Sequence, residues 1–365
     1  MAALTTMPIY QFESPLMAIN VIKIFVLGTF SFLAAFLFTP ALTHFLYKYK
    51  LWRKEVRDQA LDGAKVPVFQ KFHSEGEVKT PRFGGTLIWL GTLFTALVFF
   101  LLSKIDVWWL QKLNFLSQSQ TWLPLFTLIA ASSLGLVDDI LQVIRVGPHA
   151  GRGLSVKQRL VVVTIIGLIG AWWFYAKLGG NSIHVPGVGD FIIGVWYIPL
   201  FVVTMLAIYS GGVIDGIDGL SGGVFATIYG AFAFISLWRG QIDLAAFCIV
   251  ILGTILAFLW FNIPPARFYL SETGTLGLCA TITVVAFLTD SVLVLPIIAF
   301  LLVAESASVI IQLASKRFRG KKVFLAAPIH HHFEALGWPS YKVTMRFWII
   351  SIVMAIVGVV IRLMG

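Results

Sequence analysis

The sequence predicts an all-α integral membrane protein with about ten transmembrane helices. Hydrophobic residues make up 58% of the 365 residues, whereas charged residues make up only 12%. The mean hydropathy of +0.90 is far above that of a soluble domain. Apolar runs of ~20 residues, the length that crosses the hydrocarbon core of a bilayer, recur along the whole chain. We therefore expect one polytopic membrane domain over residues 1–365.

Ten apolar segments are candidates for membrane-spanning helices. The first follows Glu13 and lacks the layout of a cleavable signal peptide, so we interpret it as a helix. The eighth is short, and Pro296 interrupts the ninth. In chain order the ten segments cover residues 18–40, 84–103, 122–140, 160–177, 191–210, 219–238, 242–262, 274–289, 291–314 and 345–364.

The basic residues predict the orientation in the membrane. Most of the 27 Lys and Arg residues fall in the loops that follow the odd-numbered segments. Because basic loops stay in the cytoplasm, we expect both chain ends outside. Topology therefore explains much of the net charge of +10, which also attracts anionic headgroups or phosphorylated substrates. Membrane lipid, and no nucleic acid, is expected among the partners.

Acidic residues gather in these cytoplasmic loops. Asp138 and Asp139 end the third segment, where they oppose each other and the helix dipole. A divalent cation such as Mg²⁺ would compensate them, and the alternative is a solvated helix end. Asp215 and Asp218 stand among glycines before the sixth segment, one turn apart if that helix reaches back so far. A simple N-cap explains one of these aspartates, but not both.

The loop after the seventh segment adds the carboxylate Glu272 and the aromatic Tyr269, which is suited to stack on a nucleobase. An ordinary connecting loop is the alternative for these two residues. Further cations stand in the cytoplasmic loops and are suited to hold phosphate, although a basic collar beside the membrane would look the same. These cations are Lys79, Arg82, Lys157 and Arg159.

Three histidines, His330, His331 and His332, stand side by side between two apolar runs. Imidazoles with pKa values of ~6.5 can donate, accept, ligate a metal or carry charge at neutral pH. A solvated loop is the alternative for this cluster. Glu305 and Gln312 lie inside the ninth segment, where polar groups usually face a bundle interior or bond to another helix. The carboxylate loops and the histidines all fall on the face assigned to the cytoplasm.

These residues stand in motifs that resemble those of the polyprenyl-phosphate N-acetylhexosamine-1-phosphate transferase family. The resemblance runs from about residue 80 to the end of the chain. The triple-histidine segment Ala327–Glu334 is its most specific part and points to the muramoyl-pentapeptide branch. The segment Thr80–Gly85 looks closer to the GlcNAc-1-phosphate branch. The other matching stretches are Val137–Asp139, Gly153–Arg159, Asp215–Leu220, Asn262–Gly274 and Glu305–Gln312.

The resemblance implies a Mg²⁺-dependent transferase of the bacterial inner membrane, with active-site loops facing the cytoplasm. The implied donor is UDP-MurNAc-pentapeptide and the implied acceptor is undecaprenyl phosphate, which would give lipid I and UMP. A homodimer is compatible with this prediction. One alternative is a GlcNAc-1-phosphate transferase for another cell-envelope glycan. An alternative of another class is a secondary transporter, which would place charges near the membrane midplane.

The resemblance also implies roles for individual residues. Asp138 would deprotonate or orient the acceptor phosphate, with Asp139 assisting. Glu272, where the family usually has Asp, and Asp215 would hold Mg²⁺. The catalytic set is completed by His330, His331 and His332, which would contact donor phosphates or assist the metal. The expected substrate-binding residues are Asp215, Gly216, Ile217, Asp218, Asn262, Tyr269, Gln312, Lys79, Arg82, Lys157 and Arg159.

Overall fold

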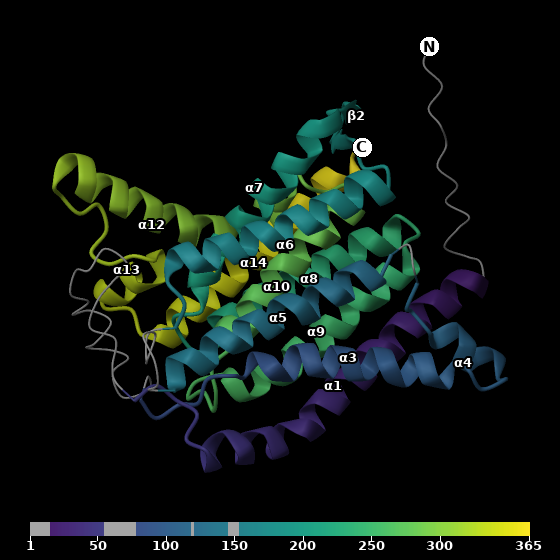
Figure 1. Ribbon diagram of the computed structural model, residues 1–365, viewed down its shortest axis with the longest axis horizontal. Coiled ribbons are helices and arrows are strands. Elements are labelled where there is room, and N and C mark those ends of the chain that lie inside the picture. The colour runs from purple at the N-terminus through teal and green to yellow at the C-terminus, as the bar shows by residue number, and fades with distance from the viewer. Residues whose placement is uncertain (1–14, 55–77, 118–119, 145–152) are drawn as a thin grey trace.

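The structure is a computed structural model, which describes residues 15–54, 78–117, 120–144 and 153–365 and is mostly helical (Figure 1). Within this part of the chain, nine helices are long and apolar enough to cross a membrane. The predicted class of an all-α multi-pass membrane protein is thereby confirmed. The nine are α1 (Pro15–Lys48), α3 (Gly85–Leu102), α5 (Trp122–Val143), α6 (Val156–Lys177), α7 (Tyr197–Ser210) with its flanking 3₁₀ turns η2 (Gly194–Trp196) and η3 (Gly211–Ile214), α8 (Leu220–Trp238), α9 (Ile242–Asn262), α10 (Ser271–Leu288) and α14 (Ser340–Leu363).

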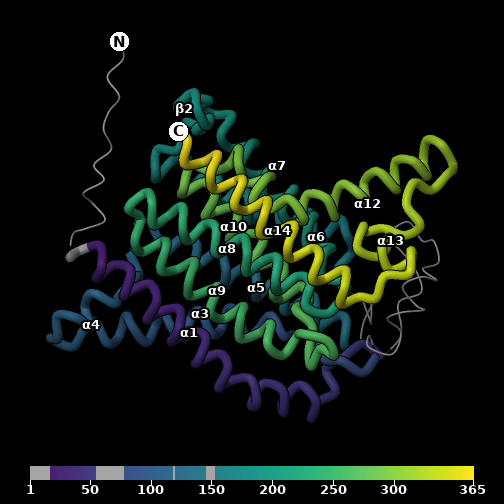
Figure 2. The backbone as a smooth tube through the Cα atoms, turned by 180° about the vertical axis from the view of Figure 1, so that it is seen from behind, coloured from purple at the N-terminus to yellow at the C-terminus, as the bar shows by residue number. Residues whose placement is uncertain are grey.

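The segment 291–314, expected as one span, forms two helices instead. α11 (Leu295–Ile298) and α12 (Phe300–Arg319) are separated at Ala299, whose φ of −97° and ψ of 30° are not helical. α11 lies against the last part of α14, where Ile298 contacts Gly358. α12 then leads toward α13 (Ile329–Ala335) at the opposite end of the bundle (Figures 1 and 2). The chain still passes from one end of the bundle to the other here, but as two helices separated at Ala299 instead of one continuous helix.

α12 is amphipathic in the sense opposite to a helix of a soluble protein. From Glu305 onward its buried positions are polar, whereas its exposed side is apolar up to the basic end at Arg317 and Arg319. In a bilayer the apolar side faces lipid and the polar side faces the interior. The expectation that Glu305 and Gln312 face inward therefore agrees with the structure. The buried polar residues are Glu305, Ser306, Ser308, Gln312 and Ser315, and the exposed apolar residues include Val303, Ile310, Ile311, Leu313 and Phe318.

α10 is the most enclosed of the spanning helices, with 89% of its apolar window buried, and it contacts α3, α5, α7 and α8. Small residues let the neighbouring helices approach it closely. A Cβ atom on Gly135 of α5 would lie 2.2 Å from the main-chain oxygen of Glu272. A Cβ atom on Gly85 of α3 would lie 2.2 Å from the nitrogen of Gly274. The first turn of α10 is therefore held between α3 and α5, which fixes the position of Glu272.

The two ends of the bundle carry different small elements (Figure 2). One end holds the antiparallel hairpin of β1 (Ser182–Val185) and β2 (Gly189–Ile192), together with the last residues of the chain, and α4 (Trp108–Leu113) follows α3 at that end. The other end holds η3, α13 and the described parts of the basic loops. The predicted site residues gather at this second end.

Candidate active site

Asp139 joins α5 to the start of α10. Its side chain is fully buried, and its Oδ2 atom accepts a hydrogen bond of 2.9 Å from the N–H of Thr273. This places a carboxylate at a helix N-terminus, where the helix dipole favours negative charge. The Nε atom of Arg82 lies 3.2 Å from the Oδ1 atom of Asp139. Asp139 therefore has both a structural partner and a cationic partner.

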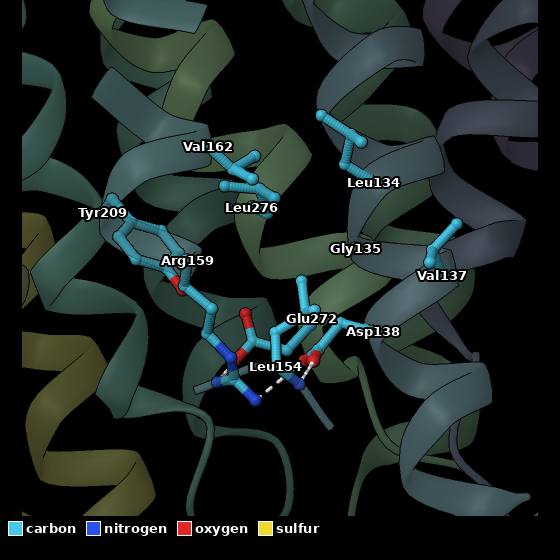
Figure 3. A pocket seen from close by; sticks show the side chains of 10 residues that line it. All are labelled: Leu134, Gly135, Val137, Asp138, Leu154, Arg159, Val162, Tyr209, Glu272 and Leu276. Carbon is cyan, nitrogen blue, oxygen red and sulfur yellow. Dashed lines mark hydrogen bonds and ion pairs between the residues drawn. The ribbon is translucent and has the colours of Figure 1, made fainter. Parts of the chain in front are cut away.

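Arg159 bridges Asp138 and Glu272 (Figure 3). Its Nη2 atom lies 2.8 Å from Oδ2 of Asp138, and its Nη1 atom bonds to Oε1 of Glu272. Figure 3 shows the three side chains converging from α5, α6 and α10 around a cavity of about 50 Å³. Tyr209 of α7 also lines this cavity, with its hydroxyl group beside Arg159.

The start of α6 explains how Arg159 reaches this position. Ser155 and Gln158 form a capping box, in which the Ser155 hydroxyl accepts from the Gln158 N–H and the Gln158 side chain accepts from the Ser155 N–H. The cap begins the helix at Val156 and sets Arg159 in its first turn. The main-chain N–H of Leu154, just before the cap, bonds to Asp138 Oδ1. The local sequence thus ties the α6 start directly to the carboxylates.

The turn between η3 and α8 carries the other pair of aspartates. α8 begins only at Leu220, so the helix does not reach back to Asp215 and Asp218, and the condition for placing them one helical turn apart is not met. The backbone instead reverses at Gly219, whose φ of 76° suits glycine. Asp218 Oδ2 accepts a hydrogen bond of 2.9 Å from the N–H of Ala266. Asp218 therefore fastens the turn to the loop that follows α9.

Asp215 reaches from this turn to the start of α10. Its two oxygens accept hydrogen bonds of 2.8 Å from the Ser221 hydroxyl and the Ser271 N–H. Burial raises the pKa of the Asp215 carboxyl, an effect that these hydrogen bonds and the neighbouring Arg82 and His330 oppose. Burial works against the charge of Arg82, yet Asp139, Asp215 and Glu272 together raise the pKa of its guanidinium. The site thus favours a charged arginine among carboxylates.

The histidines lie on the short helix α13 rather than in a solvated loop. His330 is fully buried and His331 is nearly so, with ring centroids 4.1 Å apart. A Cβ atom on Gly216 would lie 2.2 Å from His330 Nε2. α13 therefore packs directly on the turn that holds Asp215. His332 is half-buried on the same helix.

The donor set is compatible with one divalent cation. Four carboxylates, Asp138, Asp139, Asp215 and Glu272, share the site with two guanidinium groups. Among the described residues, no three His, Cys, Asp or Glu side chains form a ready metal site. Mg²⁺ does not need one, because it usually binds one or two carboxylates together with water and substrate phosphate. The excess of negative charge and the oxygen donors therefore fit Mg²⁺ shared with a phosphate ligand.

Comparisons with known proteins identify the family. Residues 121–290 match the family model described as Glycosyl transferase family 4. Proteins named phospho-N-acetylmuramoyl-pentapeptide-transferase are similar over most of the chain. The one from Geobacillus thermodenitrificans is 33% identical over 336 residues, which is 91% of this chain and 95% of its own length. The one from Lactiplantibacillus plantarum is 32% identical over 90% of this chain and 96% of its own length. The one from Oceanobacillus iheyensis is 36% identical over 78% of this chain and 84% of its own length.

The chain belongs to the phospho-N-acetylmuramoyl-pentapeptide-transferase family. It is therefore a multi-pass membrane transferase, and the resemblance found in its motifs is confirmed. The similarity to the Geobacillus thermodenitrificans protein covers 91% of this chain, and the family model covers residues 121–290. The transporter alternative gains no support from it.

Two side-chain amides that are expected to bind substrate form hydrogen bonds to the main chain of this transferase. Asn262 Oδ1 accepts from the Gly219 N–H at 3.0 Å, and its Nδ2 donates to the Phe268 carbonyl at 2.9 Å. Gln312 of α12 bonds to the main chain of Val323 and Phe324 at 2.9–3.0 Å. Each side chain therefore shapes a loop of the site. Both amides still support the site, but through loop geometry.

The remaining predicted residues lie around the rim or behind it. Ile217 is buried in the hydrophobic core beneath the turn. Tyr269 is half-buried, and its N–H bonds to the carbonyl of Pro81. Lys79 and Lys157 are exposed at the same end of the bundle. These positions suit contact with the outer parts of a large ligand better than contact with the carboxylate cluster.

Sequence reasoning missed several polar partners in the site. Glu305, Glu334, Tyr209 and Gln142 were not assigned roles, although each contacts a predicted residue. A signal existed for Glu305, since a carboxylate in an apolar helix needs a partner. Glu334 follows His331 by three residues, a spacing that brings side chains together on a helix. Tyr209 and Gln142 gave no such signal, because tyrosines and glutamines are common near membrane interfaces.

Proposed function

We propose that the chain transfers phospho-MurNAc-pentapeptide from UDP-MurNAc-pentapeptide to undecaprenyl phosphate during peptidoglycan synthesis, giving lipid I and UMP. The observation that carries the proposal is the likeness to proteins named for this transfer over 91% of the chain. The carboxylates, guanidiniums and histidines at the basic end support it, because both reactants are anionic. We place this end on the cytoplasmic side of the bacterial inner membrane, in accord with its basic loops.

In the proposed reaction, an oxygen of the lipid phosphate forms a bond to the β-phosphorus of the donor. The bond from that phosphorus to the bridging oxygen breaks, and UMP leaves with the electron pair. Asp138 orients the acceptor phosphate and takes its proton when one is present, while Asp139 holds the start of α10 in place. The positive charges of Arg82 and Arg159 lie where negative charge accumulates, and such preorganised charge is a major source of catalysis.

Glu272, together with Asp215, would hold Mg²⁺. When bound, Mg²⁺ supplies charge neutralisation of the donor diphosphate and polarisation of its phosphorus–oxygen bonds. His330 and His331 would lie beside the donor phosphates on α13 and would bind a phosphate oxygen through Nε2 when the ring carries a second proton, and His332 would add a contact at the rim. Arg82 and Arg159 already pair with carboxylates of the site, so few carboxylate oxygens remain to bind a cation. Phosphate oxygens of the substrate would complete the coordination of that cation.

The uridine end of the donor would lie along the turn from Gly216 to Asp218, with Tyr269 beside it. The main-chain groups of this glycine-rich turn can approach a ligand closely. Lys79 and Lys157 at the rim would attract the phosphates or the acidic groups of the stem peptide. The whole set would belong to one membrane domain, and the assembly of two copies as a homodimer would leave these roles unchanged.

The test is UMP release by the purified protein with undecaprenyl phosphate and UDP-MurNAc-pentapeptide, with and without Mg²⁺. UDP-GlcNAc is supplied in a parallel reaction. We expect metal-dependent UMP release with the muramoyl donor only, and we expect Asp138→Asn to abolish it. Asp290→Asn, which removes an exposed ion pair with Arg239 far from the site, serves as the control and should keep full turnover.

Three results would contradict the proposal. Turnover of UDP-GlcNAc alone would assign the chain to the sister activity, to which the Thr80–Gly85 segment is also similar. Release of UMP at the same rate from Asp138→Asn would remove that residue from the mechanism. Equal activity after removal of divalent cations would exclude the metal role of Glu272 and Asp215.

A further inference from the structure

The ring nitrogens of His330 and His331 are both engaged by carboxylates. His330 Nδ1 lies 3.0 Å from Glu305 Oε2, and both side chains are fully buried. His331 Nδ1 lies 2.7 Å from Glu334 Oε2. When Glu305 and Glu334 are ionised, each carboxylate can only accept a hydrogen bond, and the Nδ1 atom of each ring then carries the proton. The other ring nitrogen of a neutral imidazole is then an acceptor.

His332 is held in the opposite way. Its Nδ1 atom lies 3.2 Å from the main-chain nitrogen of Leu325, and a main-chain N–H can only donate. The Nδ1 atom of His332 must therefore be unprotonated, which leaves the proton of the neutral ring on Nε2. Gln312 supports this contact, because it bonds to the main chain of the two residues just before Leu325.

We propose that Glu305 is a positioning residue, which keeps a proton on Nδ1 of His330. Glu334 does the same for His331, and the main chain before α13 does the opposite for His332. Three consecutive histidines thus have two different tautomers in the resting protein. His330 thereby offers a basic Nε2 atom, whereas His332 offers an Nε2–H donor.

The surroundings of His330 show what this arrangement achieves. Its Nε2 atom is buried and has no hydrogen-bond partner among the described residues, and it faces Gly216. A buried acceptor without a partner is costly unless a ligand supplies a donor. If His330 takes up a proton, the negative charge of Glu305 stabilises the cation, although the His331 ring is only 4.1 Å away. His330 is therefore prepared to accept a hydrogen bond or a proton, and His332 is prepared to donate to an anionic oxygen.

The direct test is ¹⁵N NMR of the full-length protein labelled at its seven histidines, recorded in detergent without substrate. Protonated and bare ring nitrogens differ widely in ¹⁵N chemical shift. Single His→Asn variants assign the signals. We expect protonated Nδ1 for His330 and His331, and bare Nδ1 for His332. A neutral His330 with its proton on Nε2, or a protonated Nδ1 in His332, would overturn the proposal.

Substitution of the carboxylates separates positioning from folding. Glu305→Gln should change the His330 signals, leave those of His332 unchanged, and lower kcat by about 10- to 100-fold with a smaller change in KM, as for other residues that orient a functional imidazole. Glu305→Asp keeps the charge and should restore part of kcat. Unchanged His330 signals in Glu305→Gln would overturn the role of Glu305. If this variant does not fold, the wild-type tautomers and Glu305→Asp still decide the question.

The chain provides a matched control at its other end. His184 Nδ1 lies 2.7 Å from Asp190 Oδ1 in the hairpin of β1 and β2, far from the site. Asp190→Asn should change the His184 signals and leave turnover unaltered. The kinetic part rests on the proposed function, whereas the tautomers are measured without substrate. Absence of UMP release from the wild-type protein would therefore reject the function and leave the tautomer result standing.

Discussion

At the scale of single residues, the site is a balance of carboxylates against guanidinium groups. Arg159 is the centre of this balance, because it contacts Asp138 on α5 and Glu272 on α10 at once. A guanidinium can bond two carboxylates through its separate N–H groups, which a lysine ammonium does less specifically. The length of each carboxylate side chain therefore matters as much as its charge.

The first prediction concerns the length of Glu272. Glu272→Asp withdraws the carboxylate by one methylene group, which should break its bond to Arg159 and displace a metal held there. We expect turnover to fall about 10- to 100-fold, since small misplacements in an active site have effects of this size. Asp290→Glu, a comparable change in the exposed pair with Arg239, should have no effect. Wild-type turnover by Glu272→Asp would show that the site tolerates both lengths.

The second prediction concerns the absence of a side chain at Gly216. Gly216→Ala would place a methyl group 2.2 Å from His330 Nε2, so the ring or the turn must move. We expect turnover to fall by about 100-fold. The matched variant is Gly230→Ala, because a Cβ atom on that α8 glycine would meet only Leu252, at 3.9 Å. Equal turnover of the two variants would mean that His330 does not act from its present position.

The sequence could predict which residue types gather, but not which atoms they use. Asp138, Arg82 and His330 were expected in the site because charges and imidazoles stand out in an apolar chain. The amides of Asn262 and Gln312, which we expect to bind substrate, also bond to the main chain of neighbouring loops, and nothing in the sequence reveals such bonds.

At the scale of elements, the site depends on how α10 is held by its neighbours. Its first turn provides Ser271, Glu272 and Thr273, and all three donate main-chain N–H groups to aspartates of other elements. The close approach of α5 at Gly135 makes these bonds geometrically possible. The position of the carboxylates is therefore a packing property of two helices.

The third prediction tests this packing. Gly135→Val would drive α5 away from the main chain of Glu272, and overpacking of this kind costs about 1–3 kcal/mol. We expect a lower melting temperature in detergent and a loss of turnover. Gly230→Ala again serves as the control and should melt at the wild-type temperature or above. A Gly135→Val protein with wild-type stability would show that the helices can separate without cost.

The sequence predicted well which segments form membrane-spanning helices. It predicted less well where a helix is interrupted. Long apolar runs gave the nine spanning helices, because hydropathy determines which segments can lie in lipid. The break at Ala299 was not predicted, although Pro296 marked the segment as irregular. The short helix α13 was also missed, since three histidines show no apolar periodicity and its helix is defined by contacts with Glu305 and the η3 turn.

At the scale of the whole molecule, the two ends of the bundle are chemically different. The hairpin of β1 and β2 lies at one end, and α13 with the basic loops lies at the other (Figure 1). Charge asymmetry predicts that the α13 end faces the cytoplasm. The natural cysteines, Cys248 and Cys279, are fully buried, so they should not interfere with labelling at the surface.

The fourth prediction uses that property to determine orientation. A cysteine introduced as Val188→Cys should react in intact cells with a maleimide that does not cross the membrane, because Val188 is 70% exposed in the hairpin. Lys322→Cys, beyond α12, should react only after the membrane is permeabilised. The unmodified chain is the control for background labelling. Reversed accessibility of the two positions would refute the proposed orientation.

The inverted amphipathicity of α12 makes the surrounding lipid part of the catalytic apparatus. Glu305 and Gln312, which hold His330 and the chain before α13, are anchored on a helix whose outer side is supported by hydrocarbon. When lipid is stripped away by a harsh detergent, α12 loses that support while the enclosed helix α10 keeps its own packing. We therefore expect a harsh detergent to abolish turnover before it unfolds the protein, and returning the protein to a bilayer to restore it.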